Sequence, residues 1–120
     1  MKNLWGFSIA VIAALILAAC ESEPLPPKSD AELHLTEQQA RGRRLFDQSC
    51  AQCHRAYSSE TQSGPSLRDV FKKKELPSGA PANGDRVREN ILLGRAKMPG
   101  FRNLFSDDQV DDLIAYLHTL

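Results

Sequence analysis

Apolar and small residues recur along the chain at the spacing of α-helices. A capping box formed by Thr36 and Gln39 predicts the start of the first helix of a folded domain. One face of that helix consists of Gly42, Leu45, Phe46 and Ser49. The sequence therefore predicts a helix that begins at Thr36 and buries this face.

Three further helices are predicted downstream. The segments Ser66 to Phe71 and Asp85 to Leu93 have helical patterns, and Gly94 ends the second of them. A second capping box, Ser106 with Gln109, opens the last helix. Its apolar stripe consists of Val110, Leu113, Ile114 and Leu117. Since the chain holds no alternating strand pattern of useful length, we expect an all-α fold with long loops.

The first 19 residues have the pattern of an export signal. A short positive segment ends at Asn3, apolar residues run from Leu4 to Leu17, and two alanines follow. The whole apolar stretch, Leu4 to Ala19, is 16 residues long. A membrane-spanning helix needs roughly 18 or more, so residues 1–19 are predicted to be a cleaved signal peptide.

The junction Leu17-Ala18-Ala19-Cys20 resembles a bacterial lipoprotein signal. The resemblance implies that Cys20 is lipidated and becomes the first residue of the mature chain, which would attach the protein durably to a membrane. The alternatives are an uncleaved anchor and an ordinary exported protein with an unmodified cysteine. This reading also accounts for the odd number of cysteines, which is three.

Residues 20–34 are predicted to be the lipidated cysteine and a flexible tether. The segment Glu21 to Leu33 contains three prolines, four acidic residues and only two leucines. That is too little apolar surface to offset the entropy of ordering the segment. Residues 35–120 are then the single domain, held up to roughly 40 Å from the bilayer at about 3.1 Å per residue.

The net charge of zero is the sum of a positively charged middle segment and negatively charged flanking segments. The whole chain has 15 basic and 15 acidic residues, which gives no reason to expect a nucleic-acid binder. Residues 41–102 hold 13 basic against 6 acidic residues, a net charge of +7. Residues 20–40 hold one against five, and residues 103–120 none against four. The middle of the domain is therefore basic and its flanks are acidic.

The segment Cys50-Ala51-Gln52-Cys53-His54 is the attachment signature of a c-type haem. Its spacing lets two thiols add to the porphyrin edge while the next residue presents an imidazole to the iron. A thioredoxin-type disulfide is the first alternative, but such a motif opens a helix, whereas here the cysteines close one. A zinc site is the second, and it lacks a convincing fourth ligand. We expect one haem c, bound covalently through Cys50 and Cys53.

The chain resembles the class I c-type cytochromes over most of residues 36–120. Gly42 and Phe46 match the glycine and aromatic residue of the family's first helix, and Leu113 and Tyr116 match the last helix that it crosses. The missing side chain of Gly42 also suits a close helix crossing independently of the family. The resemblance implies a cytochrome c fold of three to five helices with long loops around one haem.

Two further segments carry the resemblance. Gly64-Pro65-Ser66-Leu67 resembles the segment whose proline carbonyl accepts a hydrogen bond from the haem-ligating histidine, which implies this role for Pro65 towards His54. Met98 is the only methionine left after signal removal, and Pro99 disfavours a helix there. The matching family loop implies that Met98 is the second axial ligand of the iron.

Iron with His54 and Met98 as ligands has no free position, so the expected function is single-electron transfer in a bacterial membrane or periplasmic redox chain, not enzymatic catalysis. A subunit that accepts electrons within an oxidoreductase complex fits equally. The alternative is a haem-based ligand sensor or peroxidase-like protein in which Met98 is displaced.

Apolar candidates for the haem pocket and its support are Leu45, Phe46, Leu67, Val70, Phe71, Ile91, Leu92, Phe101, Leu104 and Leu113.

Basic residues bracket the predicted Met98 loop. Arg95, Lys97 and Arg102 are candidates for docking an acidic face of a redox partner, and the alternative is that they only solvate the surface. The expected location is the bacterial cell envelope. There the lipid anchor would hold the domain on the periplasmic side or at the outer face of the cytoplasmic membrane.

Overall fold

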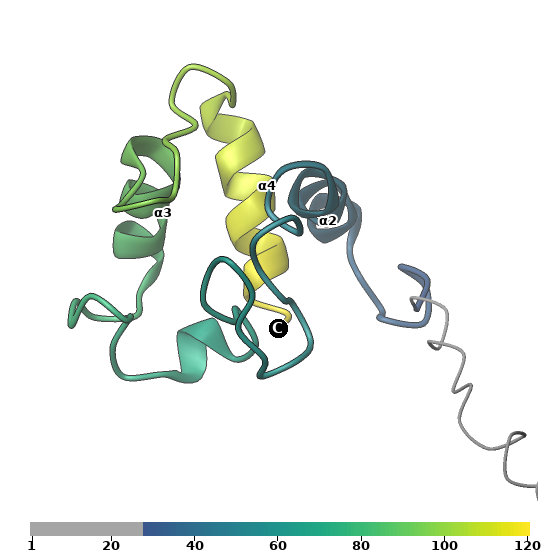
Figure 1. Cartoon of the computed structure of the whole chain (residues 1–120). Coiled ribbons are helices and arrows are strands. Elements are labelled where there is room, and N and C mark those ends of the chain that lie inside the picture. Colours follow the sequence, from purple (N-terminus) through teal and green to yellow (C-terminus); the bar gives the residue numbers. More distant parts are fainter. Residues whose placement is uncertain (1–27) are drawn as a thin grey trace, which may run out of the picture.

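The computed structural model describes residues 28–120, which form three α-helices and one 3-10 helix (Figure 1). In chain order these are α2 (Glu37–Ser49), η1 (Val70–Lys72), α3 (Gly84–Leu93) and α4 (Asp107–Leu117). The all-α prediction is confirmed for this part of the chain. The predicted signal peptide and Cys20 lie outside the described residues. Within residues 28–120 no helix has the length and apolar character needed to cross a membrane.

Helices α2 and α4 both begin at the predicted capping boxes. The Thr36 hydroxyl accepts a hydrogen bond from the Gln39 amide at 3.2 Å, and the Gln39 side chain accepts one from the Thr36 amide at 2.9 Å. Ser106 and Gln109 repeat the arrangement at 3.3 and 2.9 Å. Each box satisfies two amides that the first turn of a helix leaves without partners.

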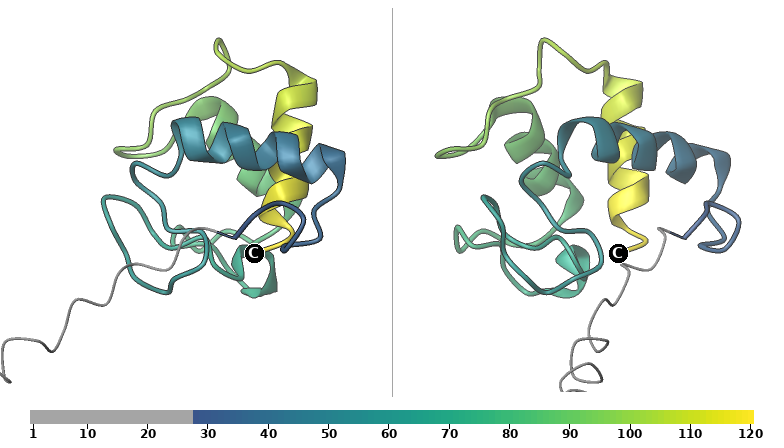
Figure 2. Two further views of the ribbon diagram at one scale, coloured as in Figure 1. Left: turned by 90° about the vertical axis from the view of Figure 1, so that its right-hand side faces the viewer. Right: turned by 45° about the vertical axis from the view of Figure 1, so that its right-hand side comes forward.

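Helix α2 crosses α4, and the two backbones touch at Gly42 (Figure 2). A Cβ atom at Gly42 would lie 1.9 Å from the carbonyl oxygen of Asp112, so any other residue would push the helices apart. The rings of Phe46 and Tyr116 pack beside this contact, with centroids 5.5 Å apart, and Leu113 is fully buried. Gly42, Phe46 and Tyr116 thus lie together at the crossing, and Leu113 lies in the core cluster that contains Phe46 and Tyr116.

A bidentate ion pair spans the same crossing. The Arg41 guanidinium donates from Nε to one oxygen of Asp112 at 2.7 Å and from Nη2 to the other at 2.9 Å. Only 11% of the Asp112 side chain is exposed. These hydrogen bonds hold the pKa of the Asp112 carboxyl below its usual range.

The predicted helix at Ser66 to Phe71 is wrong. Helical backbone is confined to the single turn of η1, because Asp69 in front of it has a left-handed conformation with φ of 55°. The Ser66 hydroxyl donates to the carbonyl oxygen of Ser58 at 2.5 Å, which stabilises the loop conformation of this segment. Such side-chain bonds to the main chain compete with helix formation.

Helix α3 starts one residue before the predicted position and ends as predicted. The Asn83 side chain caps its start by accepting from the Arg86 amide at 3.0 Å, and Gly94 ends it with φ of 74°. Two isolated bridges, Glu75 with Pro81 and Arg95 with Met98, are the strand-like pairings of residues 28–120.

Residues 28–34, assigned above to the tether, lie against α2. Arg43 donates to the Asp30 carboxylate at 2.7 Å and to the carbonyl oxygen of Lys28 at 2.6 Å. The Leu35 amide donates to the Asp30 carbonyl at 3.0 Å, which closes a turn. The end of the predicted tether that joins the domain is thus held by hydrogen bonds and does not form a free linker.

Candidate haem site

The pentapeptide Cys50 to His54 forms a tight turn at the end of α2. The Cys50 amide donates to the Phe46 carbonyl at 2.8 Å, and the amides of Cys53 and His54 both donate to the Cys50 carbonyl, at 3.0 and 2.9 Å. Neither cysteine forms a disulfide with any of residues 28–120, and Cys53 is exposed while Cys50 is half-buried. Before any haem is attached, burial raises the pKa of the Cys50 thiol to about 11.

The imidazole of His54 is held by a main-chain carbonyl. Its Nδ1 lies 2.8 Å from the carbonyl oxygen of Pro65. Because a carbonyl can only accept, Nδ1 is the donor, and in the neutral ring this tautomer leaves the lone pair of Nε2 available to a metal. The Pro65 carbonyl thus orients the imidazole of His54.

Gly64 makes room for this imidazole. A Cβ atom at Gly64 would lie 2.6 Å from Cε1 and 2.9 Å from Nδ1 of His54. The Gly64 amide also donates to the Cys53 carbonyl at 2.8 Å. The sequence analysis named Gly64 only as part of a motif, and the structure adds the reason for a glycine at this position.

Met98 lies in a loop that folds back on α3. Arg95 and Met98 exchange main-chain hydrogen bonds, with amide-to-carbonyl distances of 3.0 and 2.9 Å, around Ala96 in a left-handed conformation. The amides of Phe101 and Arg102 then donate to carbonyls in the last turn of α3. Met98 is half-buried and packs against the apolar core.

Two glycines permit the close return of this loop. A Cβ atom at Gly94 would lie 2.5 Å from the Met98 carbonyl oxygen, and one at Gly100 would lie 2.8 Å from the Leu92 carbonyl oxygen. Since both clashes are with main-chain atoms, side-chain movement could not relieve them. Any side chain at Gly94 or Gly100 would therefore force the main chain of the loop to move.

Most of the predicted pocket residues contribute to the core, but the half-buried Leu45 and the exposed Leu104 do not. The Leu104 side chain is 72% exposed, because the turn from Phe101 points it outward while Phe101 and Phe105 stack on each other, with centroids 5.1 Å apart. Buried members of the predicted set are Phe46, Val70, Ile91 and Leu113, and half-buried members include Leu67, Phe71, Leu92 and Phe101. Core residues that the prediction missed include Leu76, Val87 and Leu120.

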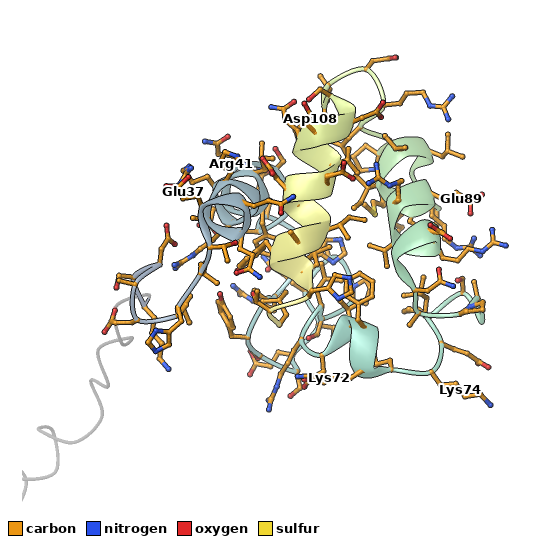
Figure 3. The ribbon with its side chains drawn as sticks, turned by 180° about the vertical axis from the view of Figure 1, so that it is seen from behind. Glu37, Arg41, Lys72, Lys74, Glu89 and Asp108 are labelled. Atoms are coloured by element: carbon orange, nitrogen blue, oxygen red, sulfur yellow. The ribbon has the colours of Figure 1, made fainter. Side chains whose placement is uncertain are left out.

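The three basic residues around the Met98 loop are exposed. Arg95, Lys97 and Arg102 form no ion pair with any of residues 28–120. By contrast, Lys72 is paired with Asp69 at 2.5 Å. Figure 3 shows Lys72 and Lys74 at the η1 end of the molecule, away from the α2–α4 crossing. The charges near Met98 are thus free to act on other molecules.

These groups fit a covalently bound haem. Two cysteines lie in one turn, an imidazole donates from Nδ1 to a carbonyl and so directs Nε2 to a metal, and a glycine leaves space for the imidazole ring. A half-buried thioether supplies a soft second donor. The fold and this donor set define a class I c-type cytochrome.

Comparison with known proteins agrees with this class. Residues 37–117 match the family described as cytochrome C oxidase, cbb3-type, subunit III, and the chain belongs to this family. It is similar to cytochrome c6 of Leptolyngbya boryana, with 26% identity over 65% of this chain and 87% of the relative. It is also similar to cytochrome c6 of a Nostoc species, with 24% identity over 98% of this chain and 92% of the relative. The chain carries haem c and is an electron carrier, not an enzyme.

Proposed function

We propose that the protein passes single electrons between redox partners of a bacterial cell envelope, with the haem bound through Cys50 and Cys53 and the iron ligated by His54 and Met98. The observation that carries this assignment is the hydrogen bond from His54 Nδ1 to the Pro65 carbonyl, which orients the neutral imidazole with Nε2 as the metal-binding nitrogen. The haem supplies a one-electron ferric–ferrous couple. Met98 adds a soft sulfur donor, which favours the ferrous state and raises the reduction potential relative to two histidines.

Close packing around the two ligand-bearing segments supports an electron carrier in particular. Gly64 and Pro65 contact the His54 imidazole, and the main chain of the Met98 loop packs against Gly94 and against the end of α3 at Gly100. A ligand set that moves little between oxidation states needs little reorganisation when an electron arrives or leaves.

The axial ligands are tested by optical spectroscopy of the oxidised protein. With Met98 bound, the ferric spectrum should contain a sulfur-to-iron charge-transfer band, and Met98→Ala should abolish it. The reduced wild-type protein should not bind carbon monoxide at neutral pH, whereas Met98→Ala should. Ready binding of carbon monoxide by the wild-type protein would instead favour a ligand sensor or a peroxidase-like protein.

We propose that Arg95, Lys97 and Arg102 form the docking surface for an acidic partner. All three are exposed, and all surround the Met98 loop. Complementary charge speeds encounter at low salt and loses effect as salt screens it. Lys97→Glu should slow electron transfer at low salt, and Lys74→Glu is the matched control because it makes the same change at the η1 end (Figure 3). Equal effects of the two variants would refute this surface.

Lipid attachment through Cys20 is the remaining part of the proposal, supported by the signal-like residues 1–19 and the junction that follows them. Mass spectrometry of the mature protein should find acyl chains on an N-terminal Cys20. Cys20→Ser should release the protein from the membrane fraction. A mature chain that retains residues 1–19 would contradict cleavage.

A further inference from the structure

We propose that Ser66 is a positioning residue for His54: its hydrogen bonds fix the Pro65 carbonyl that holds the imidazole. The inference rests on the proposed role of His54 as an iron ligand. Ser66 lies in the Gly64 to Leu67 segment named above, where only Pro65 was given a role. The evidence is the set of hydrogen bonds made by Ser66.

Ser66 takes part in three hydrogen bonds. Its hydroxyl donates to the carbonyl oxygen of Ser58 at 2.5 Å and accepts from the Arg68 amide at 3.2 Å. Its own carbonyl oxygen accepts from the Lys73 ammonium at 3.2 Å. The residue is half-buried, so water competes little for the hydroxyl. Both the side chain and the main chain of Ser66 are thus held by hydrogen bonds.

The position of Ser66 determines where the Pro65 carbonyl points. The pyrrolidine ring fixes φ of Pro65, which leaves ψ as the one soft main-chain torsion of that residue. A change in ψ moves the Pro65 oxygen and the Ser66 nitrogen together, because both are bonded to the same carbon. Holding Ser66 therefore holds the oxygen that lies 2.8 Å from His54 Nδ1.

Two neighbouring main-chain bonds complete this attachment. The Gly64 amide donates to the Cys53 carbonyl at 2.8 Å, and the Leu67 amide donates to the Arg55 carbonyl at 2.9 Å. Besides the His54–Pro65 contact, three hydrogen bonds thus join residues 64–67 to residues 53–58. The hydroxyl of Ser66 makes the only one of these three bonds that depends on a side chain, so substitution can remove it and leave the other two.

The hydrogen bond to Pro65 has a chemical consequence at His54. Donation from Nδ1 to a carbonyl makes the imidazole more basic, and a more basic ligand stabilises ferric relative to ferrous iron. If the carbonyl loses its alignment, the imidazole donates less electron density. The reduction potential should then rise.

Ser66→Ala in the haem-loaded protein tests the inference. We expect an upward shift of the midpoint potential and exchange of the His54 Nδ1 proton with solvent about fivefold faster by nuclear magnetic resonance, the factor that one ordinary hydrogen bond provides. Ser66→Thr keeps a hydroxyl and should restore both values. Ser58→Ala is the matched control, because the bond uses the Ser58 main-chain oxygen and not its side chain.

A purely structural role for Ser66 would give a different result. If Ser66→Ala lowers only the melting temperature and leaves the potential and the Nδ1 proton exchange as in the wild type, the inference is overturned. Equal shifts in Ser58→Ala and Ser66→Ala would overturn it as well. Absence of the sulfur-to-iron band in the wild type would refute the Met98 ligand alone, because the Ser66 measurements report on His54.

Discussion

The hydroxyl of Tyr57 lies 2.8 Å from the hydroxyl of Tyr116, so a surface side chain satisfies a buried polar group of α4. Tyr116 is 1% exposed and Tyr57 is 51% exposed. Burial, followed by the hydrogen bond to Tyr57, raises the pKa of Tyr116 far above its usual value. The pair also ties the loop that follows His54 to the α2–α4 crossing.

Tyr57→Phe should destabilise the protein more than an exposed position suggests. It leaves the Tyr116 hydroxyl without its hydrogen-bond partner in the core, which costs about 1–3 kcal/mol. Thermal or denaturant unfolding of the haem-loaded protein measures the loss.

Tyr116→Phe provides the comparison for this prediction. The Tyr57 hydroxyl that remains can turn to water, so the cost should be about 1 kcal/mol. In a Tyr116→Phe background, Tyr57→Phe should then have little effect. An equal cost of Tyr57→Phe in both backgrounds would contradict the role given to this hydrogen bond.

Features that depend on residues close together in the sequence were predictable. The capping boxes at Thr36 and Ser106 depend on residues three positions apart, and both are present. The haem signature lies within five residues, and its cysteines close α2 as expected. The helical patterns and the lack of an alternating strand pattern predicted the all-α fold, and the family resemblance added the cytochrome c fold.

Two predictions failed because the pattern of apolar residues does not show which partners a side chain takes. The pattern at Ser66 to Phe71 has helical spacing, but the Ser66 hydroxyl bonds to the Ser58 carbonyl, a contact that competes with helix formation. Leu104 is apolar, but the stacked rings of Phe101 and Phe105 leave it outside the core. Apolar spacing does not indicate such competition for space and hydrogen bonds.

Gly64→Ala should disturb the histidine side of the haem site. The new Cβ would lie 2.6 Å from His54 Cε1, and the Cys53 carbonyl, 3.1 Å away, limits any compensating shift. Overpacking of this kind costs about 1–3 kcal/mol, so we expect less haem-loaded protein and a weaker bond from His54 to Pro65. Yield by haem staining and His54 Nδ1 proton exchange measure the two effects.

Gly84→Ala is the matched control for that substitution. Gly84 is the first residue of α3, and a Cβ atom there would meet nothing within 4 Å. Alanine has the higher helix propensity, so this variant should be as stable as the wild type or slightly more stable. A loss of haem yield in Gly84→Ala equal to that in Gly64→Ala would point to a general effect of replacing glycine.

Arg43→Gln should release the segment that lies against α2. The Arg43 side chain is 13% exposed and bonds to Asp30 and to the Lys28 carbonyl. Without these bonds, trypsin should cleave after Lys28 at least about fivefold faster, as detected by mass spectrometry. Arg44→Gln is the control, because Arg44 is exposed and lies 3.9 Å from Asp30. Equal cleavage rates in both variants would contradict the role of Arg43.

Asp112→Asn should lower the melting temperature at neutral pH, because the amide cannot accept both bonds from Arg41. The pKa of the Asp112 carboxyl is lower in the folded than in the unfolded chain. Its ion pair with Arg41 therefore stabilises the fold fully above the unfolded pKa of about 3.9, and this stabilisation is lost as the pH falls through the lower pKa of the folded state. Melting curves from about pH 7 to about pH 3 should therefore show the difference between wild type and Asp112→Asn narrowing below about pH 4. In an Arg41→Met background the difference at neutral pH should be smaller. A difference that widens in acid would contradict the paired state of this carboxylate.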